Sequence, residues 1–164
     1  MDYGSILSAM PSPRPSPSKL AARTARWATT MTRWAIRFST TGKRFGTLAV
    51  KRWQFVAFPG PAGSESRGIV DMLAIRRDHQ EAPEPLLPGD LFEIVLVQIK
   101  GGSASWPTPS DLCRLRAVGR RYRARAIVLA AWKKGAEPTF YVLKRSGLDR
   151  RKAWREVSAS VAFE

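Results

Sequence analysis

The sequence predicts an α/β fold in which helices flank one mixed sheet, and three observations indicate it. Five short segments are rich in β-branched and aromatic residues and are bounded by Gly or Pro, as strands are. Two segments have helical periodicity, one before the strands and one between the third and the fourth. The fourth strand segment is apolar throughout, which is typical of a central strand beside a parallel neighbour.

The length of 164 residues suits one ordinary domain, which we expect to span residues 19–164. Residues 1–18 end in alternating Pro and Ser, a composition that cannot form a packed element, so we expect a disordered tail. From Tyr3 to Ser64 the chain has ten Lys or Arg and no acidic residue. This composition resembles an organellar transit segment, and a start codon placed too far upstream would produce it as well.

The charge balance predicts a polyanionic partner. The chain has 28 Lys and Arg against 13 Asp and Glu, a net charge of +15, so nucleic acid is the first expectation and an anionic membrane surface the second. A compositional bias toward Arg is the alternative. No apolar run approaches the roughly 20 residues of a spanning helix, so we expect no membrane. The lone Cys113 and single His79 form no zinc cluster, and a cytoplasmic location is expected.

The first element is a helix from Lys19 to Phe38. One apolar stripe at helical spacing runs along it, and arginines flank the stripe. We expect this stripe to pack on the sheet. The alternative is a basic amphipathic helix lying on a membrane or on a phosphate backbone. The stripe consists of Trp27, Met31, Trp34 and Phe38.

Three strands follow, and the loops between them predict antiparallel neighbours. A second helix begins near Thr108, which suits the N-cap, with Pro109 at the first helical position and Asp111 at the third. Two more strands and a short helix around residues 149–157 complete the domain. The five strands are expected at residues 52–58, 68–77, 91–100, 126–132 and 139–145. The apolar stripe of the second helix is Leu112, Leu115, Val118 and Tyr122.

Chemistry is expected where the third strand ends. Gln98 and Lys100 share one face of that strand, and Asp71 interrupts the apolar run of the strand before it. A buried carboxylate needs a partner, a metal or a cation, so Asp71 is expected beside Gln98 and Lys100 if the two strands pair. In the alternative, Asp71 pairs with Arg67 or Arg76, and Gln98 and Lys100 only mark the end of a buried strand.

These residue types suit phosphodiester hydrolysis. Asp71 and Gln98 could hold Mg²⁺ or Mn²⁺ through oxygen, together with the main-chain carbonyl of Ile99. The ion would polarise a phosphate and lower the pKa of a bound water. Lys100 would orient that water or neutralise the charge that develops on the phosphate.

The order of elements around Asp71 and the Gln-Ile-Lys sequence at 98–100 resembles the PD-(D/E)xK, restriction-endonuclease-like, nuclease superfamily over residues 19–145. The Gln version is similar to that of Mrr-like endonucleases, and the length is similar to that of Holliday-junction resolvases. The resemblance implies an αβββαβ core and a magnesium-dependent DNA endonuclease with Asp71 and Gln98 at the metal and Lys100 at the catalytic position. It also implies a homodimer.

Two departures from the resemblance bear on activity. The first helix has no acidic residue, so Glu65 is the nearest substitute for a further metal ligand, and Gln98 stands where an acid is common. Weak metal binding, or a degenerate site that binds without cutting, would follow. The alternatives are therefore a catalytically degenerate nucleic-acid-binding module of the same fold, or a basic membrane- or ribosome-associated protein.

Basic residues on the second helix and after the fourth strand suit phosphate binding, which would depend strongly on salt. Trp106, just before this helix, could stack on a base. A solvated face is the alternative. The predicted nucleic-acid-binding residues are Arg114, Arg116, Arg120, Arg121, Arg125, Lys133 and Lys134.

Overall fold

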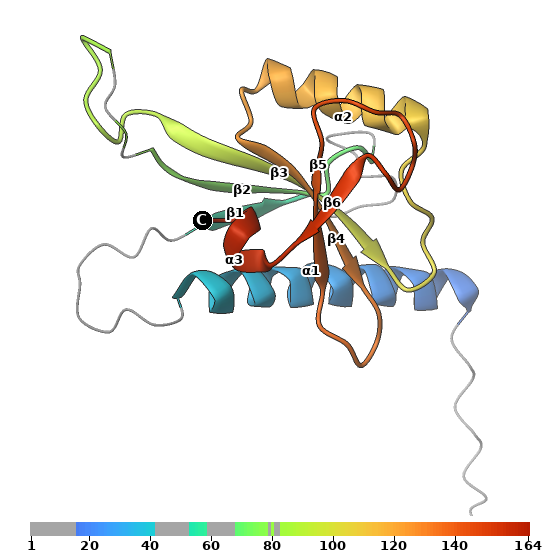
Figure 1. The fold of residues 1–164 in the computed structure, drawn as a ribbon. Coiled ribbons are helices and arrows are strands. Elements are labelled where there is room, and N and C mark those ends of the chain that lie inside the picture. Colours follow the sequence, from blue (N-terminus) through green and yellow to red (C-terminus); the bar gives the residue numbers. More distant parts are fainter. Residues whose placement is uncertain (1–15, 42–52, 59–67, 79, 81–82) are drawn as a thin grey trace, which may run out of the picture.

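A computed structural model describes residues 16–41, 53–58, 68–78, 80 and 83–164 of the chain. Helices and strands alternate in the order α, three strands, α, three strands, α (Figure 1). The elements are α1 (Pro17–Thr41), β1 (Gln54–Ala57), β2 (Met72–Arg77), β3 (Phe92–Gly101), α2 (Pro109–Arg121), β4 (Ala126–Trp132), β5 (Thr139–Leu143), β6 (Trp154–Val157) and α3 (Ala159–Ala162).

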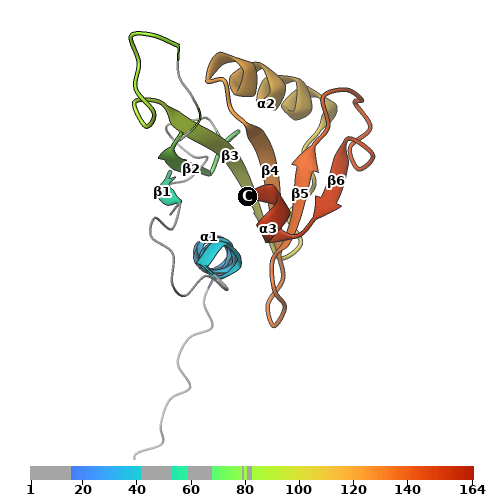
Figure 2. The ribbon, with the colours of Figure 1, turned by 60° about the vertical axis from the view of Figure 1, so that its left-hand side comes forward.

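The six strands form one mixed sheet in chain order, which confirms the predicted class. Neighbours are antiparallel except β3 and β4, which are parallel because α2 carries the chain back between them. The predicted antiparallel arrangement of the first three strands is therefore confirmed. Helix α1 lies on one side of the sheet and α2 on the other (Figures 1 and 2).

Each face of the sheet has its own apolar core, because successive strand residues point to opposite faces. On β3, Val95 and Val97 face α1 and α3, whereas Leu96 faces α2. The α1 side includes Ile36, Met72, Val128, Phe140 and Phe163. The α2 side includes Leu112, Leu115, Leu129, Leu143 and Trp154.

Helix α1 packs on the sheet through one face, whose residues nearest the end of β3 are small. Ala28, Thr32 and Ile36, four residues apart, are fully buried. The helix comes so close to the end of β3 that a Cβ atom added at Gly101 would lie 3.1 Å from the Cβ atom of Ala28. Small residues permit this approach and indole rings do not.

The predicted packing stripe of α1 is therefore wrong, although the helix does cover the sheet. Trp27 and Trp34 are each 55% exposed and Phe38 is 65% exposed, while Met31 is half-buried. The larger apolar side chains face outward because the close approach selects the face with Ala and Thr. None of the described helices is both long and apolar enough to cross a bilayer.

Helix α1 begins at Pro17, two residues before the predicted start of the domain at Lys19. Residues 1–15 lie outside the described part of the chain. Pro17 is compatible with this position because the first turn of a helix does not need its N–H groups.

The start of α2 agrees with the prediction in detail. The Thr108 hydroxyl accepts a hydrogen bond of 3.2 Å from the Asp111 N–H, and the Asp111 carboxylate accepts one of 2.9 Å from the Thr108 N–H. Leu112 and Leu115 are fully buried. Tyr122, the last member of the predicted stripe, is 60% exposed because the helix ends at Arg121 and Tyr122 is its C-cap.

The short helix expected around residues 149–157 is wrong. Trp154–Val157 form strand β6 on β5, and the final helix follows only at Ala159. The Asp149 carboxylate accepts N–H bonds from Arg151 and Lys152, each of 3.0 Å, and so forms a turn before β6. Burial of the Trp154 side chain in the α2-side core favours the extended conformation.

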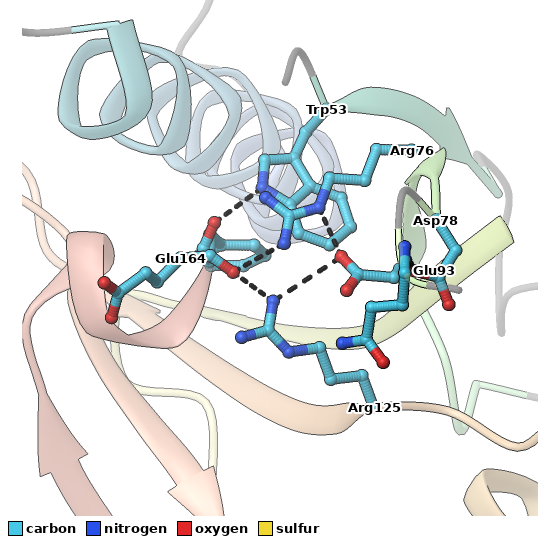
Figure 3. A network of polar contacts seen from close by, with 8 residues as sticks. Trp53, Arg76, Asp78, Glu93, Arg125 and Glu164 are labelled. Carbon is cyan, nitrogen blue, oxygen red and sulfur yellow. Dashed lines mark hydrogen bonds and ion pairs between the residues drawn. The ribbon is translucent and has the colours of Figure 1, made fainter. Parts of the chain in front are cut away.

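A polar network ties the final residues to the far end of the sheet, away from the end of β3 (Figure 3). The Arg76 guanidinium forms an ion pair with Glu93 and donates a hydrogen bond of 2.6 Å to a main-chain oxygen of Glu164. The Arg125 guanidinium lies 3.6 Å from the Glu93 carboxylate and also donates to Glu164. Arg76 therefore pairs with Glu93 and not with Asp71, while Arg67, the other partner considered for Asp71, lies outside the described residues.

Candidate functional site

Asp71 lies just before β2, opposite the carboxyl end of β3. Its N–H donates a hydrogen bond of 3.0 Å to the Val97 carbonyl, and its own carbonyl accepts one of 3.0 Å from the Phe58 N–H. Its carboxylate accepts a bond of 2.6 Å from the N–H of Ile99, the residue between Gln98 and Lys100. The structure therefore brings Asp71 to the backbone of the Gln-Ile-Lys segment, as the predicted strand pairing requires.

Gln98 is a buried polar residue whose side-chain oxygen is unpaired among the described residues. It is 2% exposed, and its side-chain oxygen has no hydrogen-bond partner among the residues the structure describes. An unsatisfied buried acceptor costs about 1–3 kcal/mol. An N–H donor, a water or a cation at this oxygen would remove that cost.

The surroundings of Asp71 disfavour its charged form. Burial raises the pKa of this carboxyl above its ordinary value, and neither the Ile99 N–H nor the Lys100 ammonium, which both lower it, cancels the effect. The Lys100 ammonium also helps to lower the pKa of Asp111, after the larger effects of the Thr108 hydrogen bonds. Lys100 is thus electrostatically close both to Asp71 and to the start of α2.

A hollow of about 640 Å³ opens beside Lys100. Its walls come from the loop between β3 and α2, the end of β4, the β4–β5 connection and the turn before β6. Trp106, Tyr141, Lys133 and Arg151 are among its lining residues. Asp71 and Gln98 are not among them, so the hollow and the carboxylate site meet at Lys100.

Arg116, predicted to bind nucleic acid, is engaged within the fold. Its guanidinium donates to the carbonyl of Lys144 at 3.0 and 3.1 Å, to that of Ser146 at 3.0 Å and to that of Gly147 at 2.7 Å. These bonds hold the connection from β5 to β6 against α2. Arg125 is engaged as well, through Glu93.

The other predicted phosphate-binding side chains are exposed, in two separate places. Lys133 and Lys134 lie after β4, at the end of the sheet that carries Lys100. Arg120 and Arg121 lie at the other end of α2, where a second hollow of about 470 Å³ is lined by Arg120 and further cations. Arg114, near the start of α2, lies 3.7 Å from the Asp111 carboxylate.

The donor set suits a hard cation. A carboxylate and an unpaired amide oxygen are oxygen ligands of the kind that Mg²⁺ binds while keeping several of its waters. Glu65, the predicted third ligand, lies outside the described residues. Within the described part of the chain no group of three or more His, Cys, Asp or Glu could hold a metal ion. Of the three predicted metal ligands, the structure describes Asp71 and Gln98.

Sequence reasoning missed two features of this end of the sheet. The partner of the Asp71 carboxylate is the main-chain N–H of Ile99. Every residue except proline carries such a group, so residue type does not predict this contact. Arg150 donates a hydrogen bond of 2.6 Å to the Trp106 carbonyl and belongs to a run of basic residues after β5. The sequence shows that this run is basic, but nothing in it predicts a contact with the loop between β3 and α2.

No protein-family model, curated protein or solved structure matches this chain.

Proposed function

We propose that this chain is a metal-dependent DNA endonuclease of restriction-endonuclease-like fold, similar to the PD-(D/E)xK superfamily. The observation that carries the proposal is the Asp71 carboxylate bonded to the N–H of Ile99, between Gln98 and Lys100. The order of helix, three antiparallel strands, crossover helix and parallel strand supports it, because the resemblance implies this order. A homodimer and a cytoplasmic location belong to the same proposal.

Each residue has a distinct role in this proposal. Asp71 and Gln98 would hold Mg²⁺ or Mn²⁺, and the ion would supply a polarised phosphate and a water of lowered pKa. Lys100, whose ammonium acts on Asp71 electrostatically, would neutralise charge on the attacked phosphate. Burial raises the pKa of the Asp71 carboxyl, and a bound cation would lower it again.

Nucleic-acid binding is proposed for the exposed cations. Lys133 and Lys134 stand at the same end of the sheet as Lys100 and would contact phosphates next to the cleaved one. The net charge of +15 would draw DNA to the protein and make binding weaker as salt rises.

The test is cleavage of supercoiled plasmid and of branched DNA with Mg²⁺ or Mn²⁺. Wild type should cut, and Asp71→Ala and Lys100→Ala should each lose roughly 100-fold or more in rate, in line with the loss of one group that stabilises the transition state. Asp90→Asn is the matched control, because Asp90 lies at the opposite end of β3 and is exposed. Equal cleavage by all four proteins would identify a contaminant and reject the proposal.

A catalytically degenerate nucleic-acid-binding module is the second candidate. It is favoured by Gln98 in a position where an acid is common, which leaves Asp71 as the one described carboxylate bonded to the Gln-Ile-Lys segment. This candidate predicts salt-sensitive DNA binding that is unchanged by EDTA, with no cleavage. Calorimetric titration with Mg²⁺ separates the two, because only the nuclease requires saturable binding that Asp71→Ala removes.

A further inference from the structure

The hollow beside Lys100 has a rigid aromatic wall. The Trp106 ring packs edge-on against Tyr141, with centroids 4.9 Å apart, and against Trp154 at 6.4 Å. Arg150 donates a hydrogen bond of 2.6 Å to the Trp106 carbonyl, and this bond holds the loop that carries the ring. Trp106 is half-buried, so part of it stays accessible from the hollow.

The same hollow is cationic. Lys100, Lys133, Arg150 and Arg151 line it, and Glu137 is the one acid among its described lining residues. The Arg151 guanidinium lies 5.9 Å from the centroid of the Trp106 ring and is exposed. Bases of unpaired nucleotides stack on aromatic rings and on guanidinium planes, and both surfaces are present here.

Size restricts what can enter. A volume of about 640 Å³ is within the usual range for a small-molecule site, about 300–1,000 Å³. It can take one nucleotide. A planar, anionic ligand of the size of one nucleotide fits the aromatic wall, the cations and the volume together.

We infer that this hollow binds a single unstacked nucleotide, with its base against Trp106 and Arg151 and its phosphate toward Lys100 and Lys133. The inference rests on the proposed function, because Lys100 belongs both to the hollow and to the proposed cleavage site. The substrate class is therefore DNA with an unpaired nucleotide beside the cleaved bond, as in a single strand, a flap or a branch. A continuous duplex would first have to extrude a base, which costs free energy.

Binding without cleavage tests this inference. Single-stranded DNA with one 2-aminopurine is titrated into the full chain in EDTA, and fluorescence reports stacking of that base. We expect quenching on binding, and an affinity about tenfold higher for the single strand than for a duplex of the same sequence. Trp106→Leu should weaken single-strand binding about tenfold and reduce the quenching. Trp34→Leu, which changes an exposed tryptophan on the opposite side of the sheet, should leave both unchanged.

Two exposed-residue variants keep the test independent of folding, because Trp106 also packs on Tyr141 and Trp154. Arg151→Ala should reduce the quenching, and Lys133→Ala should weaken binding and lower the salt slope by about 0.7, the single-strand value for one phosphate contact. Quenching and affinity equal to wild type in all three variants, or a duplex bound as tightly as the single strand, would overturn the inference. Failure of the nuclease proposal would appear differently, as binding without metal-dependent cleavage.

Discussion

The Asp71 carboxylate accepts a hydrogen bond of 2.6 Å from the N–H of Ile99, across the antiparallel pairing of β2 and β3. The bond joins an acid just before one strand to the backbone at the end of the next. It fixes the carboxylate beside Gln98 and Lys100 without consuming either side chain. The Gln98 amide oxygen is buried and has no hydrogen-bond partner among the described residues, and Lys100 lines the hollow at this end of the sheet.

Replacing Asp71 by Asn should change how stability depends on pH. Burial raises the folded-state pKa of Asp71, so the folded protein binds its proton more tightly than the unfolded chain does. Stability from this group is complete below the unfolded pKa of about 3.9 and is lost as pH rises through the raised folded value. The free energy of unfolding of wild type, relative to Asp71→Asn, should therefore fall in that window and then level off. Urea unfolding between pH 3.5 and about 8 measures this.

Asp90→Asn is the control, because it makes the same replacement at an exposed side chain at the opposite end of β3. A wild-type curve parallel to that of Asp71→Asn at every pH would contradict the role of burial.

Replacing Gln98 by Glu should strengthen the binding of divalent metal. Affinity at such sites rises with the number of charged ligands, and the Gln98 oxygen is buried and unpaired in the described structure. We expect Mg²⁺ to bind roughly tenfold more tightly, measured by calorimetry, and the variant to be less stable than wild type in EDTA because a second carboxylate is buried near Asp71. Gln54→Glu, on the exposed strand β1, is the control. Identical Mg²⁺ affinity in all three proteins would remove Gln98 from the proposed metal site.

Much of the sheet was predictable because its signals are local. The apolar segment Ala126–Trp132 coincides with β4, and Thr108 with Asp111 forms the predicted capping box. Patterns within a few residues are enough for both of these. The pairing of Asp71 with the Gln-Ile-Lys segment was predicted from the character of two consecutive strands, although a long loop separates them.

The errors came from relationships that are not local. The exposed tryptophans of α1 are more apolar than Ala28 and Thr32, but the buried face was decided by the fit against Gly101, far along the chain. Trp154 lies in a strand because its segment pairs with the free edge of β5. The unpaired oxygen of Gln98 and the hollow at Lys100 depend on the packing of several segments, which no single stretch of sequence encodes.

Gly101→Ala should destabilise the protein. The added Cβ would lie 3.1 Å from the Cβ of Ala28 and 3.3 Å from the carbonyl oxygen of Thr24, and α1 would have to move away from β3. Overpacking of this kind costs about 1–3 kcal/mol. Thermal or urea unfolding measures the loss, with Ser103→Ala, at an exposed position of the following loop, as the control. A variant as stable as wild type would mean that the contact between α1 and β3 is looser than described.

Two arginines of α2 should separate stability from nucleic-acid binding. Arg116 donates to three main-chain carbonyls between β5 and β6, so Arg116→Ala should lower the free energy of unfolding by about 1–2 kcal/mol. Arg120 is exposed in the basic hollow at the end of α2, so Arg120→Ala should leave unfolding unchanged. If Arg120 contacts a phosphate, its loss should weaken binding to every DNA sequence and reduce the slope of log affinity against log salt by about 0.9. Urea unfolding and fluorescence anisotropy at several salt concentrations measure the two effects. The assignment is wrong if Arg116→Ala unfolds like wild type, or if Arg120→Ala binds DNA with an unchanged salt slope.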